Sequence, residues 1–155
     1  MSTARTAPQE KPRLSTLGRW SLFWALFIGL GALLGVGMMW IVPDAMGMTP
    51  LLTSIQDNLP VIGSAFTSFL WPGICLLTII GLPNLLGAVL IWRRRKYAPM
   101  WVIICGVILL GWIALQLLVV FGWNPVSGVY LVFAVAQVVT GMLWILRVGL
   151  APSAE

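Results

Sequence analysis

The sequence predicts an all-α membrane protein, an up-and-down bundle of four transmembrane helices with both termini in the cytoplasm. Three observations predict this fold. Hydrophobic residues make up 60% of the 155 positions and charged residues only 8%, so the core of a soluble domain is too small to hold the apolar side chains. Four apolar runs are each long enough to cross a hydrocarbon layer of about 30 Å. The Lys and Arg residues lie only in the tails and in one connection between the runs.

The chain begins with a basic segment, residues 1–19, in which Pro, Ser and Thr separate four cations. We expect this segment to be a disordered cytoplasmic tail. The first span follows at residues 20–42 and contains no charged residue. It is too long and too aromatic for a cleaved signal peptide, so we expect it to be retained as a transmembrane helix.

Gly31 and Gly35 give the first span a G-x-x-x-G spacing. Two small residues four positions apart lie on one face of a helix and let another helix approach its backbone closely. We predict that this face packs within the bundle; self-dimerisation through the same face is the alternative.

The first connection, residues 43–65, is predicted to be the outer loop of the bundle. Thr49 can cap a helix and Pro50 suits the first helical position. The apolar residues that follow recur at helical spacing, opposite polar ones. Two interpretations are open, a short interfacial helix and an irregular loop over the mouth of the bundle.

The second span is predicted at residues 66–92, with Pro83 in its interior. A proline removes one helix hydrogen bond, so we expect a kink there. The third span is predicted at residues 98–121 and the fourth at 126–146, joined by a tight turn at Gly122 to Pro125. Arg147 is expected to end the fourth span. Residues 20–147 then form a single transmembrane domain, with residues 148–155 as a short cytoplasmic tail.

The distribution of positive charge predicts the orientation. Four Lys or Arg residues precede the first span, four lie in the second connection, and one follows the fourth span, whereas the other two connections have none. Loops rich in Lys and Arg stay in the cytoplasm. The same distribution explains the basic character of the chain without nucleic acid as a partner.

The spans contain no Asp, Glu, Lys, Arg or His. Proton relays, ion-coupled transporters and voltage sensors place such groups within the membrane, so these classes are disfavoured. Cys75 and Cys105 stand alone, at depths that differ by about 15 Å, which excludes a disulfide and gives no metal site. We therefore predict a protein that is not an enzyme and holds no metal or cofactor.

The polar residues within the spans are neutral, and two pairs of them share a depth. Asn84 and Gln137 both lie about 14 to 15 Å from the cytoplasmic boundary, so a hydrogen bond between them is possible. Gln116 and Tyr130 share a depth nearer the outer side, with Trp112 one turn below Gln116 on the same face. These residues either form hydrogen bonds between helices or, for Trp112, Gln116 and Tyr130, line an outward-facing pocket for a lipid or a small amphiphile.

The second connection carries four adjacent cations, Arg93, Arg94, Arg95 and Lys96. They fix this connection on one side of the membrane. They are also candidate contacts for anionic lipid headgroups, at about 1 kcal/mol for each cation.

Part of the chain, about residues 66–146, resembles a group of small, uncharacterised bacterial four-span membrane proteins. The resemblance rests on Trp71-Pro72-Gly73-Ile74, Gly81-x-Pro83-Asn84-Leu85-Leu86, Arg93-Arg94-Arg95, Gly111-Trp112 with Gln116, and Pro125 with Tyr130. It implies a multi-pass protein of the bacterial inner membrane with four helices, and it implies no activity.

Two hypotheses for the function follow. The first is a non-enzymatic integral membrane protein that acts through helix–helix contacts in the lipid bilayer, as an accessory or assembly partner of another membrane protein or as a homo-oligomer. The alternative is a small carrier or binder of a lipid or a neutral amphiphilic molecule, with its pocket between the third and fourth spans.

Overall fold

The computed structural model describes residues 14–42, 49–58, 68–120 and 125–149. These residues contain four helices that are long and apolar enough to cross a membrane. The fold prediction, an all-α bundle of four membrane-spanning helices, is confirmed, and the chain is a multi-pass integral membrane protein. The elements are α1 (Thr16–Ile41), α2 (Thr49–Asn58), α4 (Leu70–Cys75), the π-helix η2 (Leu76–Gly81), α5 (Leu82–Trp92), α6 (Ala98–Val120) and α7 (Pro125–Gly149).

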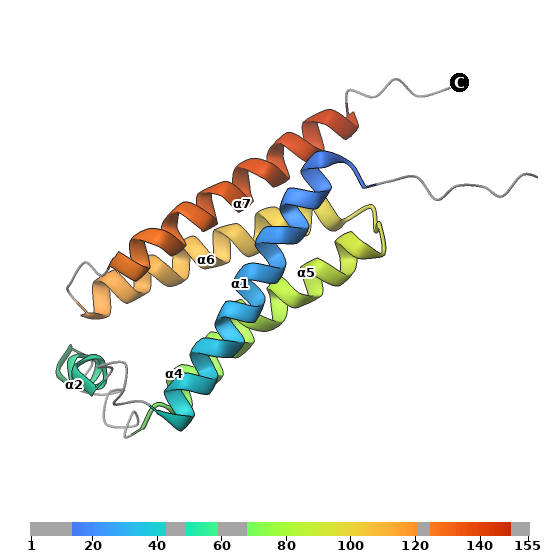
Figure 1. Cartoon of the computed structure of the whole chain (residues 1–155). Coiled ribbons are helices and arrows are strands. Elements are labelled where there is room, and N and C mark those ends of the chain that lie inside the picture. The colour runs from blue at the N-terminus through green and yellow to red at the C-terminus, as the bar shows by residue number, and fades with distance from the viewer. Residues whose placement is uncertain (1–13, 43–48, 59–67, 121–124, 150–155) are drawn as a thin grey trace, which may run out of the picture.

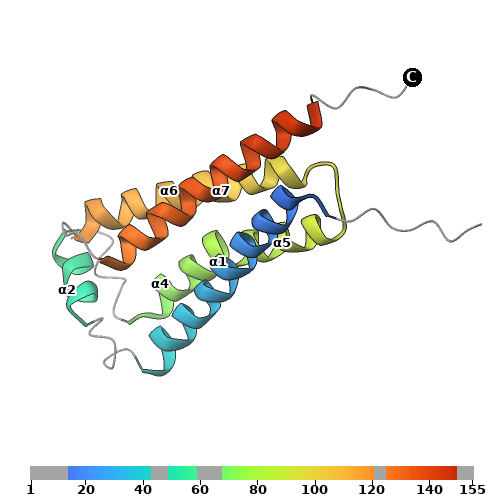
Figure 2. The same ribbon diagram turned by 45° about the horizontal axis from the view of Figure 1, so that its top comes forward.

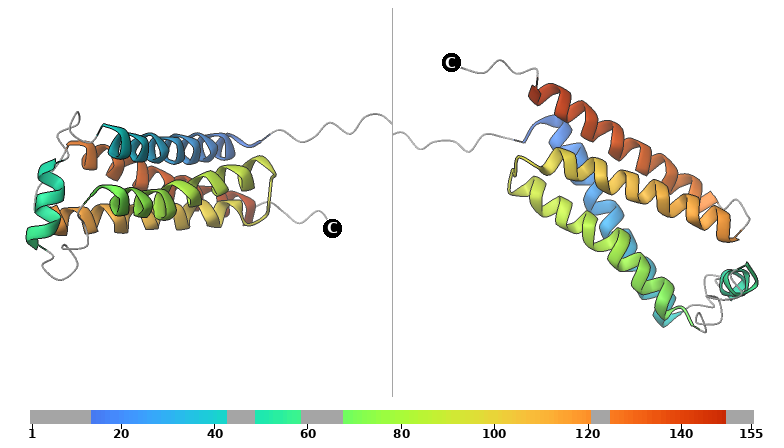
Figure 3. Two further views of the ribbon diagram at one scale, coloured as in Figure 1. Left: turned by 90° about the horizontal axis from the view of Figure 1, so that it is seen from below. Right: turned by 180° about the vertical axis from the view of Figure 1, so that it is seen from behind.

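The bundle consists of two helix pairs. α6 lies along α7, and α1 lies along the second span, which α4, η2 and α5 form together. The two pairs approach each other where α1 begins and α7 ends, and they diverge toward the other end, where α2 lies beside α6 (Figures 1 and 2). The first of these ends holds the beginning of α1, the α5–α6 connection and the end of α7 (Figure 3). We call it the basic end, because Arg19 is near the beginning of α1 and Arg147 is in the last turn of α7, and we call the other the α2 end.

Several helices begin or end a few residues from the predicted positions. α1 begins at Thr16 because the side chain of Ser15 accepts a hydrogen bond of 3.1 Å from the backbone N–H of Gly18. Residues 16–19, predicted as part of the tail, are therefore helical. α7 continues past Arg147 to Gly149, so this charged residue does not end the helix.

The sequence predicts a kink at Pro83, and the structure has a π-helix just before this residue. Residues 76–81 form a π-helix, and the N–H of Leu82 bonds to the carbonyl of Leu77, five residues back. The side chain of Thr78 donates to the carbonyl of Ile74 at 2.8 Å, another local bond to the backbone of this turn. The helix thus stays continuous from α4 to α5, with its hydrogen bonds rearranged around the proline.

Within the predicted outer loop, residues 49–58 form the helix α2, as one of the two interpretations predicted; its place at the membrane interface stays a prediction. The rest of the predicted loop lies outside the described residues. So do residues 1–13 of the predicted disordered tail, the predicted turn at 122–124, and the last six residues of the predicted C-terminal tail. The cytoplasmic location of the termini stays a prediction.

Alanine and branched aliphatic residues face the interior of the bundle. Toward the basic end the core is built on the buried residues Ala25, Ala88, Ile91, Ala98 and Val102. Nearer the α2 end it is built on Ile28, Ala32, Ile80, Leu109, Ile113 and Ala134. The spans bury only 17 to 33% of their most apolar windows, and many of their large apolar side chains are exposed. That outward surface suits lipid, because lipid tails solvate it as well as a protein core does.

Candidate functional site

Asn84 and Gln137, which the sequence predicts at the same depth, are hydrogen-bonded inside the bundle. The Nε2 of Gln137 donates to the Oδ1 of Asn84 at 2.7 Å, and both side chains are almost completely buried, at 0% and 1% exposed. The Nδ2 of Asn84 donates to the carbonyl of Ile80, four residues back, at 2.9 Å. Because Asn84 lies on α5 and Gln137 on α7, this bond joins the two helix pairs.

Ser21 adds a third buried polar group, which the sequence analysis missed. Its hydroxyl and the Oε1 of Gln137 have no hydrogen-bond partner among the described residues. On α1, Ser21 lies between Gly18 and Trp24, and both of these residues contact α7. The ring of Trp144 is 3.4 Å from the Cβ position of Gly18, and the ring centroid of Phe133 is 5.4 Å from that of Trp24. Gln137 lies between Trp144 and Phe133 on α7, so the two groups share a level. A serine at the start of an apolar run looks like a residue at the boundary of a span. The sequence therefore does not indicate that Ser21 is a buried polar group.

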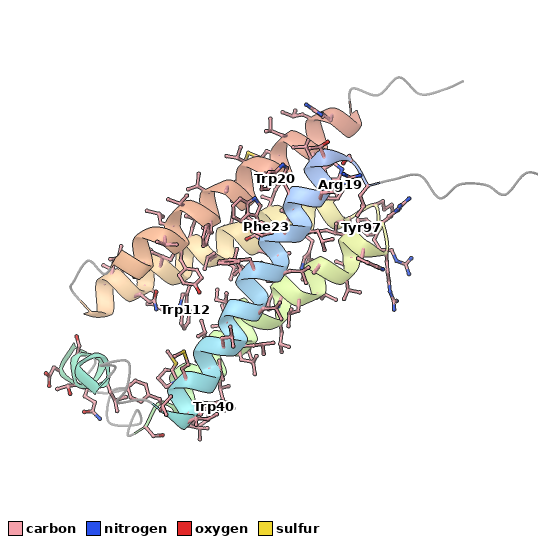
Figure 4. The ribbon with its side chains drawn as sticks, viewed as in Figure 1. Arg19, Trp20, Phe23, Trp40, Tyr97 and Trp112 are labelled. Atoms are coloured by element: carbon pink, nitrogen blue, oxygen red, sulfur yellow. The ribbon has the colours of Figure 1, made fainter. Side chains whose placement is uncertain are left out.

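Trp112, Gln116 and Tyr130 do not form a comparable polar cluster. Trp112 and Tyr130 pack against the core cluster around Ile28 and Ile113, and Trp112 lies on the side of α6 that faces α1 (Figure 4). The hydroxyl of Tyr130 lies over Gly31 of α1, 3.1 Å from the position of a Cβ. Within the described part of the chain no hydrogen bond joins Gln116 to Tyr130.

Gly31 and Gly35 both face neighbours in the bundle. A Cβ at Gly31 would meet the Tyr130 hydroxyl, and one at Gly35 would lie 3.3 Å from the Cδ2 of Leu76. Both contacts are with side chains. Closer contacts with backbone occur at Gly106 and Gly141, neither of which belongs to a G-x-x-x-G spacing.

The four cations after α5 lie in a compact turn. The N–H of Arg94 bonds to the carbonyl of Ile91 and that of Arg95 to the carbonyl of Leu90, each at 3.0 Å. This pair of bonds is the Schellman motif, which ends a helix with a residue in the left-handed conformation. That residue is Arg94, with a φ of 53°.

A shallow groove of about 510 Å³ lies on the surface between α5 and α6, lined mostly by η2 and α5 and, from α6, by Trp101. Its wall is held by the carbonyl of Pro83, which accepts bonds from the Nε1 of Trp101 at 2.9 Å and the Sγ of Cys105 at 3.4 Å. The ring of Trp101 also lies 3.0 Å from the Cβ position of Gly87. The lining residues are Thr78, Leu82, Pro83, Leu85, Leu86, Val89 and Trp101.

A second hollow, of about 300 Å³, lies at the basic end. It combines cations with an aromatic ring and aliphatic side chains. Its lining residues are Leu14, Ser15, Arg94, Arg95, Lys96, Pro99 and Trp144. Arg93, the remaining cation of the turn, is not among them. Neither this hollow nor the groove is lined by Trp112, Gln116 or Tyr130.

The described residues contain no cluster of His, Cys, Asp and Glu side chains suited to a metal ion. Cys75 and Cys105 are free thiols. Comparisons with protein families, with curated proteins and with solved structures found no match. The function is therefore argued from the geometry of this chain.

Proposed function

We propose that this protein is a non-enzymatic component of the bacterial inner membrane, an accessory or assembly protein that binds a neighbouring membrane protein, or a second copy of itself, by helix–helix contact. The basic end faces the cytoplasm in this proposal, as the positive charge there favours. The observation that carries the proposal is the groove between α5 and α6.

The groove has the features that association within lipid requires. Lipid tails are as apolar as leucine, so helices in a membrane associate through close packing rather than through the hydrophobic effect. Leu82, Leu86 and Val89 line the groove and are 52, 47 and 46% exposed. A helix that inserts side chains between them gains contacts that a smooth helix surface does not offer.

The walls of the groove are also fixed before any partner arrives. Trp101 donates a hydrogen bond to the carbonyl of Pro83. Asn84, which follows Pro83 in the chain, is hydrogen-bonded both to the carbonyl of Ile80 and to the side chain of Gln137. A preformed surface loses little conformational freedom on binding, which favours association. The carrier hypothesis has less support, because Trp112 and Tyr130 pack against the core.

Purification in a mild detergent tests the proposal, with a variant that fills the groove. We expect the wild-type chain to elute with one stoichiometric partner or as a defined oligomer. Val89→Trp places a large side chain in the groove and should abolish that association. Val132→Trp is the matched control, because Val132 is an outward-facing valine of α7, 64% exposed and outside the groove.

Two outcomes would contradict the proposal. The first is a wild-type chain that is monomeric and alone in every mild detergent and in native-lipid particles. The second is an association that Val89→Trp and Val132→Trp weaken to the same extent, because the groove would then have no special part in it.

A further inference from the structure

We infer that the hollow at the basic end is a binding site for one anionic phospholipid. The beginning of α1, the α5–α6 connection and the last turns of α7 surround it, because Ser15, Arg94 and Trp144 all line its wall. Segments distant in the sequence thus supply both a charged part and an apolar part. The site does not depend on the proposed helix–helix association.

The charge of the hollow is positive and not neutralised by the residues described around it. Arg94, Arg95 and Lys96 line it together. Among the described residues the acidic side chain is Asp57, which lies on α2 at the opposite end of the bundle. No ion pair with a carboxylate holds these three cations in the described part of the chain. A phosphate group has the charge and the acceptor oxygens that they can bind.

Arg94 has a backbone conformation that other residues adopt more easily. Its φ of 53° lies in the left-handed region, where glycine is the usual residue at the end of a helix. For ending α5 alone, a glycine at this position would serve as well as the arginine and would avoid the strain. Its side chain, however, lines the hollow. Strain of this kind is retained where the side chain has a function, and here that function is to hold an anion.

The apolar part of the hollow distinguishes a lipid from a free phosphate ion. Trp144 lines it, and the ring of Trp144 is fixed against α1, 3.4 Å from the Cβ position of Gly18. Leu14 and Pro99 complete the apolar wall. Tryptophan is enriched at the level of lipid headgroups, where its ring contacts the glycerol region and the first carbons of the acyl chains. The hollow therefore fits a headgroup together with the upper part of its chains.

Native mass spectrometry of the full-length chain in detergent, titrated with dioleoylphosphatidylglycerol or dioleoylphosphatidylcholine, tests this inference. We expect one phosphatidylglycerol molecule to be retained in preference to phosphatidylcholine. Arg94→Gly should weaken that retention by about fivefold or more, the effect of losing one cation close to an anionic headgroup. The variant should fold as well as the wild type, because glycine suits the φ of this position.

Arg93→Gln is the matched control, since it removes a cation from the same turn but outside the hollow. It should weaken retention by less than about twofold, as expected for an exposed and screened charge. Trp144→Leu should weaken retention of the lipid, and inorganic phosphate at millimolar concentration should not displace it.

The inference is overturned if Arg94→Gly and Arg93→Gln weaken retention equally, since the cations would then act only through their total charge. Displacement of the lipid by inorganic phosphate, or equal retention of phosphatidylcholine, overturns it as well. The measurement uses the protein without a partner. Its outcome is therefore independent of the proposed helix–helix association, which the purification experiment tests.

Discussion

The glycines of this bundle are packed in two different ways. Between α6 and α7, Gly106 and Gly141 each face backbone of the other helix: a Cβ at Gly106 would lie 3.0 Å from the carbonyl oxygen of Ala134, and one at Gly141 would lie 3.1 Å from that of Pro99. On α1, Gly31 and Gly35 face side chains, the hydroxyl of Tyr130 on α7 and the Cδ2 of Leu76, whereas a Cβ at Gly29 would lie 3.2 Å from the backbone nitrogen of Leu85. Side chains can move aside at low cost, whereas backbone cannot.

A glycine spacing in the sequence therefore indicates less about helix packing than the structure does. A G-x-x-x-G pair shows that one face of a helix is smooth enough for close approach. It does not show which residues of a second helix lie opposite. In this bundle the tightest backbone contacts belong to two glycines on different helices, each without a glycine partner at that spacing.

The largest effect is expected from Gly106→Ala. The new Cβ would lie 2.6 Å from the Cγ2 of Val138 and 3.0 Å from backbone of α7, so the two helices have to separate. We expect the free energy of unfolding to fall by about 1 to 3 kcal/mol, the usual cost of overpacking a core. Reversible unfolding in mixed micelles, followed by circular dichroism, measures it.

Gly111→Ala is the control on the same helix, because nothing lies within 4 Å of its Cβ position. It should leave the free energy of unfolding unchanged or raise it by up to about 1 kcal/mol, since alanine favours a helix more than glycine does. Equal losses in the two variants would mean that α6 and α7 are not in backbone contact at Gly106.

An intermediate effect is expected where the two pairs are joined. Asn84→Leu leaves the amide of Gln137 buried without its acceptor, and we expect a loss of about 1 to 2 kcal/mol in the free energy of unfolding. Gln137→Leu should cost a similar amount. The double variant should cost less than the sum of the two, because each single change already breaks the shared bond. Strict additivity of the two losses would show that the bond contributes nothing.

The control for this cycle is Thr140→Val on α7. The hydroxyl of Thr140 bonds only to backbone carbonyls of its own helix among the described residues, to that of Ala136 at 2.8 Å and to that of Gln137 at 3.1 Å. Its removal should not be coupled to Asn84→Leu. Coupling of equal size with Thr140 would indicate a general disturbance of α7 rather than loss of the bond between Asn84 and Gln137.

The sequence allowed prediction of the features that depend on position along a helix. Four spans, the depth of Asn84 and Gln137, and the irregularity near Pro83 follow from length, rise per residue and the missing N–H of proline. The sequence does not specify how each helix is rotated about its axis relative to a distant helix. Tyr130 and Gln116 share a depth, yet the Tyr130 hydroxyl lies over Gly31 of α1. The hollow around Trp144 requires three segments in contact, which no pattern within one segment reveals.

The smallest effect is expected from Gly31→Ala on α1. The new Cβ would lie 3.1 Å from the Tyr130 hydroxyl, the far end of a side chain that can shift by a few tenths of an ångström. The contact costs little and alanine favours the helix, so we expect the free energy of unfolding to change by less than about 1 kcal/mol. In a Tyr130→Phe background the oxygen is gone, and Gly31→Ala should then be neutral or stabilising. A loss as large as that of Gly106→Ala, unrelieved by Tyr130→Phe, would show that α1 is packed against its neighbours as rigidly as α6 is against α7.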